Sequence, residues 1–299
     1  MKIRFHPAHL LPLILLADVA QAQPYRCGQP LPRPAMSSAQ QQRLDSQLVA
    51  ALHSYRQQPG PDGLIWVARR YGYLGHYDSA IHWLSQGIQQ YPADARLYRH
   101  RGHRYLTTRC YPQAVADLEK AAALVQGLPD ETEPDGQPNA AGIPTSTLQQ
   151  NIYYHLGLAY WLQRQWPQAR QAWQRCLDLS TNPDAYVSAA NWLHLVLRQL
   201  GDEAAACRLL GTISPRAQLL ENEVYLRILL LYQQKPATDS LLAQLQQQPA
   251  DVQGATWLYG LYRYLRWRAE PQAAATVKAR LLATGQIASF GYIAAEAEE

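Results

Sequence analysis

The sequence lacks the short motifs by which many enzymes are recognised. Its 299 residues contain no G-x-S-x-G, H-E-x-x-H, C-x-x-C or P-loop pattern, and no carboxylate and histidine form a spaced pair that demands acid–base chemistry. Lysine is scarce, with four residues, so arginine supplies nearly all the positive charge. The net charge of +4 is mild and is not gathered into a basic stripe, which argues against a nucleic-acid partner.

The chain also lacks strand patterns and long apolar runs. No segment alternates with period two, so we expect no sheet. The short apolar run Leu10–Leu16 follows Lys2 and Arg4 and precedes Ala20-Gln21-Ala22, which is the layout of a secretory signal cleaved after residue 22. That run is too short to span a bilayer comfortably. We therefore expect a periplasmic or secreted protein with no transmembrane anchor after signal cleavage.

Cysteine is rare, and its spacing matches no metal motif. All four residues lie beyond the predicted cleavage site, in a compartment that permits disulfides. Cys176 and Cys207 are expected to be small core residues on helices. Cys110 falls at a predicted turn and Cys27 in an irregular leader, so a Cys27–Cys110 bridge is one candidate pairing.

What the sequence does contain is a repeat of 34 residues. At that shift Tyr71 meets Tyr105 and Ala80 meets Ala114. The third repeat carries the fullest pattern of large, small and aromatic residues: Tyr153, Leu156, Gly157, Tyr160, Trp166, Ala169 and Trp173. A small residue lets the two helices of a pair approach, and large residues fill the space around it. Because one pair cannot bury its apolar face alone, the pairs must stack.

The repeat divides the chain into six units and three flanking segments. The interval from Ala114 to Ala169 is 55 residues instead of 34, which places an insertion between the second and third units, and the fifth unit, near 221–254, is degenerate. The layout is a signal peptide (1–22), an irregular leader (23–36), an N-terminal capping helix (37–60) that Ser37 or Ser38 can cap, the array (61–288) with its insertion (127–149), and a C-terminal cap or tail (289–299).

These motifs resemble those of the tetratricopeptide-repeat (TPR) superfamily. The resemblance implies an all-α fold, an α-α superhelix of about six helix pairs plus N- and C-terminal capping helices. Further segments are similar to a group of bacterial envelope TPR proteins that carry a signal peptide: Arg99–Tyr105, Glu133–Gly136, Tyr154–Tyr160 and Phe290–Glu296. That second likeness implies a fold and a location and adds no activity.

In a TPR array the first helix of each pair lines the concave surface. The residues that the resemblance places there are Arg69, Tyr73, Arg96, Arg99, His100, His103, Asn151, Tyr154, His155, Asn191 and Trp192. Four of them, at 96, 99, 100 and 103, share a helix face by spacing alone. We predict a non-catalytic scaffold that binds an extended acidic segment of another protein, with arginine forks on its carboxylates and aromatic contact area beside them. The alternative is a solvated basic face with a few packing aromatics.

Two other functions stay open. One is binding of an anionic small molecule or glycan in the same groove, which a deep closed pocket would favour. The other is an unrecognised hydrolase, which a buried carboxylate–histidine pair would favour. We expect no cofactor and no metal, because His100 and His103 lack a third ligand and the calcium-like stretch Glu131–Gly136 lacks the distal glutamate. A chaperone-tail clamp is disfavoured, since Ile65 and Arg69 stand where it needs lysine and asparagine.

The insertion and Arg101 each pose a question. The insertion is rich in proline and acidic residues, so it either folds over the basic groove, in competition with an acidic ligand, or forms a plain surface loop. Arg101 occupies a repeat position that is usually apolar and buried. A buried arginine needs a carboxylate, and the candidates are Asp117, Asp78 or an acid of the insertion.

Overall fold

The computed structural model describes residues 24–243 and 245–298. The predicted signal peptide, residues 1–22, lies outside this range. The described residues form fourteen α-helices and one short 3-10 helix, and they contain no strand. An isolated antiparallel bridge joins Thr132 to Thr147 within the insertion. The prediction of an all-α fold is therefore confirmed.

Six consecutive helix pairs follow a first helix and precede a last one. Helix α1 is Ser38–Gln57, and Ser37 accepts the capping hydrogen bond from the Gln40 N–H. The pairs are α2 (Pro61–Tyr73) with α3 (Tyr77–Gln90), α4 (Ala95–Thr107) with α5 (Tyr111–Leu124), α6 (Leu148–Leu162) with α7 (Trp166–Asp178), α8 (Pro183–Gln199) with α9 (Glu203–Gly211), α10 (Glu223–Gln234) with α11 (Thr238–Leu242), and α12 (Val252–Trp267) with α13 (Pro271–Leu282). Helix α14 is Phe290–Ala297.

Each pair turns through one residue with positive φ. These residues are Gly75, Arg109, Arg164, Gly201, Lys235 and Ala269, and each stands shortly before the second helix of its pair. A left-handed residue ends the first helix and satisfies its last carbonyls. Glycine adopts this conformation without strain, whereas the other four residues, two arginines, a lysine and an alanine, do so at some cost.

Small residues sit where the paired helices approach most closely. Ala80, Ala114 and Ala169 are fully buried on the second helices, as the repeat predicts. On a first helix, a Cβ added to Gly157 would lie 2.6 Å from the Trp173 ring. The fifth pair departs from the pattern: α11 is only five residues long and is followed by a 3-10 turn, Leu245–Gln247, so Ser240 remains exposed.

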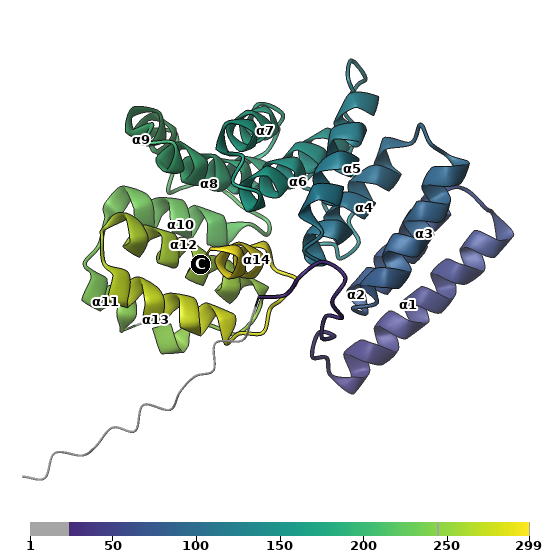
Figure 1. Cartoon of the computed structure of the whole chain (residues 1–299), viewed down its shortest axis with the longest axis horizontal. Helices are drawn as coiled ribbons and strands as arrows, with labels where there is room; N and C mark the ends of the chain where they lie inside the picture. The colour runs from purple at the N-terminus through teal and green to yellow at the C-terminus, as the bar shows by residue number, and fades with distance from the viewer. Residues whose placement is uncertain (1–23, 244, 299) are drawn as a thin grey trace, which may run out of the picture.

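Three segments cross the inner side of the superhelix. They are the insertion between α5 and α6, helix α14, and the leader from residue 24 to α1. Helix α14 packs on α12, α13 and α6, and Figure 1 shows it beside the leader at the centre of the molecule. The candidate pairing Cys27–Cys110 is confirmed as a disulfide, which ties the leader to the turn between α4 and α5.

The remaining cysteines differ from each other. Cys176 is buried in the core, as expected. Cys207 is exposed, so the prediction of a core residue is wrong there. The neighbouring Ala206 is fully buried and takes the inward position of α9, which directs the next side chain outward.

Ion pairs hold the half-buried Arg101 and the buried Arg109. Arg101 binds Asp117 through two hydrogen bonds of 2.7 Å, from Nε and Nη2, and donates a third to Ser85. This confirms the predicted structural pair and selects Asp117 as the partner. Arg109 donates to Glu296 of α14 at 2.7 Å and to the Ile287 carbonyl at 2.8 Å. The second pair joins residues 187 positions apart and so fixes α14 against the array.

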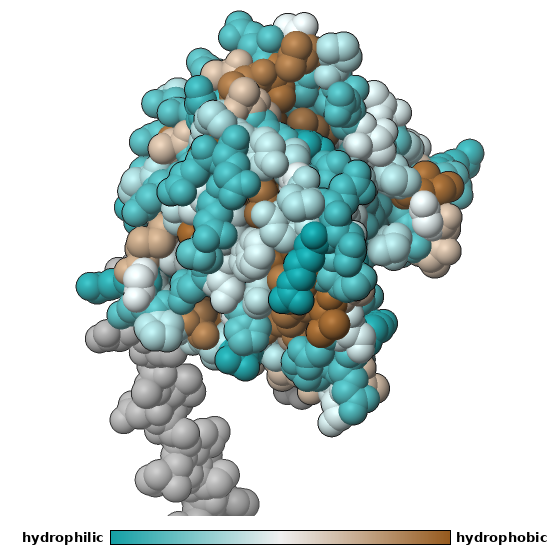
Figure 2. Space-filling view, turned by 90° about the vertical axis from the view of Figure 1, so that its right-hand side faces the viewer, coloured by the Kyte–Doolittle hydropathy of each residue, from teal (hydrophilic) through white to brown (hydrophobic). Residues whose placement is uncertain are grey.

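The described helices give no sign of a membrane span. None is long and apolar enough to cross a bilayer. On the face shown in Figure 2, hydrophilic residues separate the hydrophobic patches from one another.

Candidate functional site

The concave face binds one carboxylate, and that carboxylate belongs to the insertion. Glu133 accepts from Arg99 at 3.0 Å and from the Asn151 side-chain amide at 3.0 Å, and its carboxylate lies 3.4 Å from His100 Nε2. Arg99 and His100 come from α4 and Asn151 comes from α6. Three predicted site residues, contributed by the first helices of two adjacent pairs, thus converge on a single acidic side chain.

The backbone after Glu133 is held by a third first helix. Arg69 Nη1 donates to the Pro134 carbonyl at 2.7 Å, and Arg70 Nη1 donates to the Gly136 carbonyl at 3.2 Å. A Cβ at Gly136 would lie 2.6 Å from Arg69 Nη2 and would collide with the Tyr73 hydroxyl, so a larger residue there would have to displace these two side chains. The insertion therefore folds over the basic groove and is not a plain surface loop.

Hydrogen bonding fixes the tautomer of His100. Arginine can only donate, and Arg99 Nη1 lies 3.0 Å from His100 Nδ1, so Nδ1 carries the lone pair. The ring proton then sits on Nε2 and points toward Glu133. Burial, followed by the charges of Arg99 and Arg69, lowers the pKa of His100 well below its usual value. This neutral imidazole has both nitrogens engaged.

Two further histidines pack against α14. The rings of His103 and His155 lie 4.5 Å apart, and each is 5.4 Å from the Phe290 ring. His155 Nδ1 donates to the Asn151 carbonyl at 2.6 Å. The pKa of each ring is well below its usual value, chiefly through burial and then through nearby arginines. Both rings are therefore neutral and serve as packing surface for Phe290.

Other predicted site residues lie elsewhere. The Tyr154 hydroxyl accepts from Trp192 Nε1 at 2.7 Å and bonds to the Tyr225 hydroxyl. Trp192 stacks on Trp173 in the core, and Asn191 is 2% exposed. Trp192 and Asn191 therefore present no surface to a partner in this conformation, whereas Tyr154 is half-buried. Arg96 pairs with Asp94 and Asp62 and is not brought together with Arg99.

A small cavity remains beneath the insertion. Its volume is about 110 Å³, and its polar lining comprises Arg69, Tyr73, Arg99, His100, His103 and Arg104. Arg104 was not among the predicted site residues. It stands four positions after His100, on the same helix face, so extending the spacing by one step would have found it.

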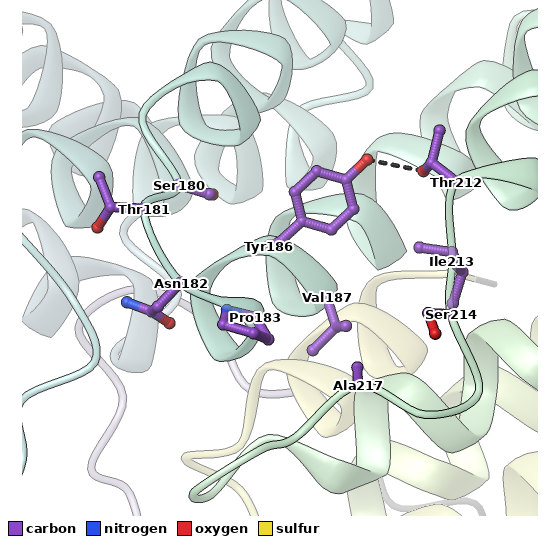
Figure 3. Close-up of a pocket in the computed structure, with 10 residues that line it drawn as sticks. All are labelled: Ser180, Thr181, Asn182, Pro183, Tyr186, Val187, Thr212, Ile213, Ser214 and Ala217. Atoms are coloured by element: carbon purple, nitrogen blue, oxygen red, sulfur yellow. Dashed lines mark hydrogen bonds between the residues drawn. The ribbon is translucent and has the colours of Figure 1, made fainter.

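The outer surface offers a larger but less distinctive hollow. It measures 340 Å³ and lies where residues 180–187 meet the segment after α9. Figure 3 shows the Tyr186 hydroxyl reaching across it to Thr212, at 2.7 Å. No charged side chain lines it, so it has no group that would select a charged ligand.

These features define a class of fold: an α-α superhelix of helix pairs whose first helices line an inner face, with that face covered by the chain's own segments. No protein-family model and no curated protein matches the chain. Among solved structures it is similar to MamA, with 18% identity, 59% of this chain and 92% of that chain covered, and a TM-score of 0.43.

Two further solved structures are similar at the same level. YrrB, described as a TPR protein with an unusual peptide-binding site, shares 14% identity over 79% of this chain and 92% of its own, with a TM-score of 0.43. A chain of the Naa15/Naa10 complex bound to HypK-THB shares 16% identity over 82% of this chain and 35% of its own, with a TM-score of 0.38.

Proposed function

We propose that the protein is a non-catalytic scaffold of the bacterial periplasm or cell envelope that binds an extended acidic segment of another protein. The observation that carries this proposal is the set of contacts that binds the Glu133 carboxylate. Arg99, His100 and Asn151 hold its carboxylate, while Arg69 and Arg70 hold the next backbone carbonyls. This is the pattern by which a groove recognises an acidic peptide, through charge-assisted bonds to the side chain and donors to the main chain. In the proposal, the insertion occupies the site until a partner displaces it.

The same geometry favours binding over hydrolysis. His100 and Glu133 do form a buried carboxylate–histidine pair, which is the feature that would favour a hydrolase. A general base, however, needs a free lone pair within reach of a nucleophile. The lone pair on Nδ1 already accepts from Arg99, and Arg99 and Asn151 hold the carboxylate. The His100 imidazole is therefore not placed to act as the general base of a hydrolase.

A peptide offered in trans tests the binding proposal. Glu133→Ala removes the carboxylate anchor of the insertion and should open the groove. A labelled peptide with the sequence of residues 129–138 should then bind this variant more tightly than it binds the unchanged protein, by fluorescence anisotropy. The same peptide with glutamine at the position of Glu133 should bind weakly. The control is Arg96→Ala in the Glu133→Ala background, because Arg96 pairs locally with Asp94 and Asp62.

The outcome depends on Arg99. Adding Arg99→Ala to Glu133→Ala should abolish peptide binding while the far-ultraviolet circular dichroism stays helical. Equal binding by the two variants would show that the groove is not the site. If binding does require Arg99, a photocrosslinker placed at Tyr73 in intact cells would identify the natural partner. That crosslink should weaken when Arg99 is replaced.

The proposed location rests on two features. The first 22 residues have the layout of an export signal, and the Cys27–Cys110 disulfide suits an oxidising compartment. Cell fractionation combined with thiol trapping tests this: the protein should appear in the periplasmic fraction, with Cys27 and Cys110 protected from alkylation until reduction. Recovery in the cytoplasm with all thiols reactive would refute the location.

A further inference from the structure

The cavity beneath the insertion carries more positive charge than its surroundings neutralise. Arg69, Arg99 and Arg104 all line it. Arg99 pairs with Glu133, and Arg69 donates to a backbone carbonyl. Within residues 24–243 and 245–298, no carboxylate forms an ion pair with Arg104, whose aromatic neighbour is the Tyr77 ring at 5.9 Å. A charge taken out of water is costly unless it is paired, so this arrangement calls for an anion.

The polar groups that face the cavity include unused donors. Arg99 is 7% exposed, and its Nε is buried without a hydrogen-bond partner. The Tyr73 hydroxyl accepts from Arg69 Nε at 3.3 Å, which leaves its own proton free to be donated. His103 is a neutral imidazole with one N–H. A lining of guanidinium, hydroxyl and imidazole groups suits a ligand that offers several acceptor oxygens.

The nearby carboxylates do not remove the imbalance. Glu133 is already bound by Arg99, His100 and Asn151. Asp135 is not part of the cavity lining, and burial, then Glu221, raises its pKa. Burial lowers the pKa of Arg104 to about 10; Tyr77 and Tyr73 oppose this shift, and the charges of Arg99 and Arg69 add to it. The three guanidinium groups are thus close enough to repel one another.

We propose that this cavity binds one free tetrahedral oxyanion, phosphate or sulfate, between the guanidinium groups of Arg99 and Arg104. Its volume of 110 Å³ exceeds the roughly 30 Å³ that one water occupies in the liquid. It is also well below the roughly 300–1,000 Å³ of sites for larger organic ligands. Pro134 and Gly136 lie over the Arg69 and Tyr73 side of the cavity, which favours a free ion over a phosphoryl group attached to a chain. The inference goes beyond the proposed function and needs no protein partner.

Direct titration tests the inference. Isothermal titration of the purified full-length mature chain, in a chloride buffer of fixed ionic strength, should give saturable binding of one inorganic phosphate or sulfate per chain. Arg104→Gln removes the charge and keeps a polar side chain, and it should weaken binding at least tenfold. Arg104→Lys should recover part of the affinity as a point charge. Tyr73→Phe should weaken binding a few-fold, and it keeps the test informative if the Arg104 variants do not fold.

The control is a matched arginine on the same helix. Arg96→Gln removes a cation that lies outside the cavity lining and should leave binding unchanged. Phosphoserine serves as the attached-phosphoryl arm and should not bind. Two results would overturn the proposal. One is heat that does not saturate and that any salt at the same ionic strength also produces. The other is equal binding by the unchanged protein and Arg104→Gln. Binding of phosphoserine without binding of inorganic phosphate would overturn the assignment to a free ion.

Discussion

Buried and half-buried arginines are accommodated in two different ways in this protein. At the junction of the leader, the α4–α5 turn and α14, Arg109 meets the carboxylate of Glu296 and further backbone carbonyls. On the concave face, Arg69, Arg99 and Arg104 surround a cavity that has fewer carboxylates than cations. The first arrangement matches every charge and closes the fold. The second arrangement has more positive than negative charge. A binding site for an anion requires such an excess, whereas a structural core avoids it.

The junction should be the more sensitive region to mutation. Glu296→Ala leaves Arg109 buried without its carboxylate and removes the acceptor of the Tyr25 N–H. We expect a loss of about 3–5 kcal/mol in the free energy of unfolding, measured by urea denaturation. Arg170→Ala, which removes a more exposed pair with Asp202, should change stability little. A loss below about 1 kcal/mol for Glu296→Ala would show that the pair is not needed for closure.

The disulfide reinforces the same junction and should come next in effect. It links residues 83 positions apart, so breaking it frees a long loop in the unfolded chain. Cys27→Ser should cost about 2–4 kcal/mol of unfolding free energy and should release the leader to protease. Cys207→Ser is the control, because Cys207 is exposed and unpaired in the described structure. Equal stability of the two variants would argue against a clamp.

The concave face should respond to pH. His100, His103 and His155 each have a pKa well below the usual value, through burial first and then neighbouring arginines. The unfolded chain therefore binds more protons than the folded chain below about pH 6.5. The free energy of unfolding should therefore decrease as the pH is lowered through that range. The decrease is about 1.4 kcal/mol per pH unit for each histidine that stays neutral in the fold.

A single replacement sharpens the pH prediction. His103→Gln should reduce the slope of unfolding free energy against pH by about half a proton at pH 6.5 and by nearly one proton toward pH 5.5, measured by urea denaturation between pH 7.5 and 5.5. His53→Gln is the control, since His53 is exposed on α1. A slope that is unchanged by His103→Gln would mean that this ring has the same pKa in the folded and unfolded chain.

Local patterns in the sequence predict the helix pairs but not which segments dock on the concave face of the superhelix. The 34-residue spacing places Ala80, Ala114 and Ala169 correctly, because close helix approach is a local requirement. It does not foresee that α11 stops after five residues. The spacing of Arg99, His100 and His103 likewise predicts a shared face. Which acid of the insertion meets that face depends on the curvature of the whole superhelix, and so does the docking of α14. No local period encodes that curvature.

The second buried pair offers the smallest expected effect and the sharpest contrast. Arg101 and Asp117 match each other with two hydrogen bonds of 2.7 Å, at a repeat position that is usually apolar. Asp117→Leu alone should be clearly destabilising, because it leaves Arg101 without its carboxylate. Arg101→Leu with Asp117→Leu replaces the pair by apolar side chains, which is often neutral or stabilising. We expect the double variant to lie within about 1 kcal/mol of the unchanged protein by urea denaturation. If it is as unstable as the single variant, matched pairs in this fold contribute more than charge balance, and the contrast with the concave face weakens.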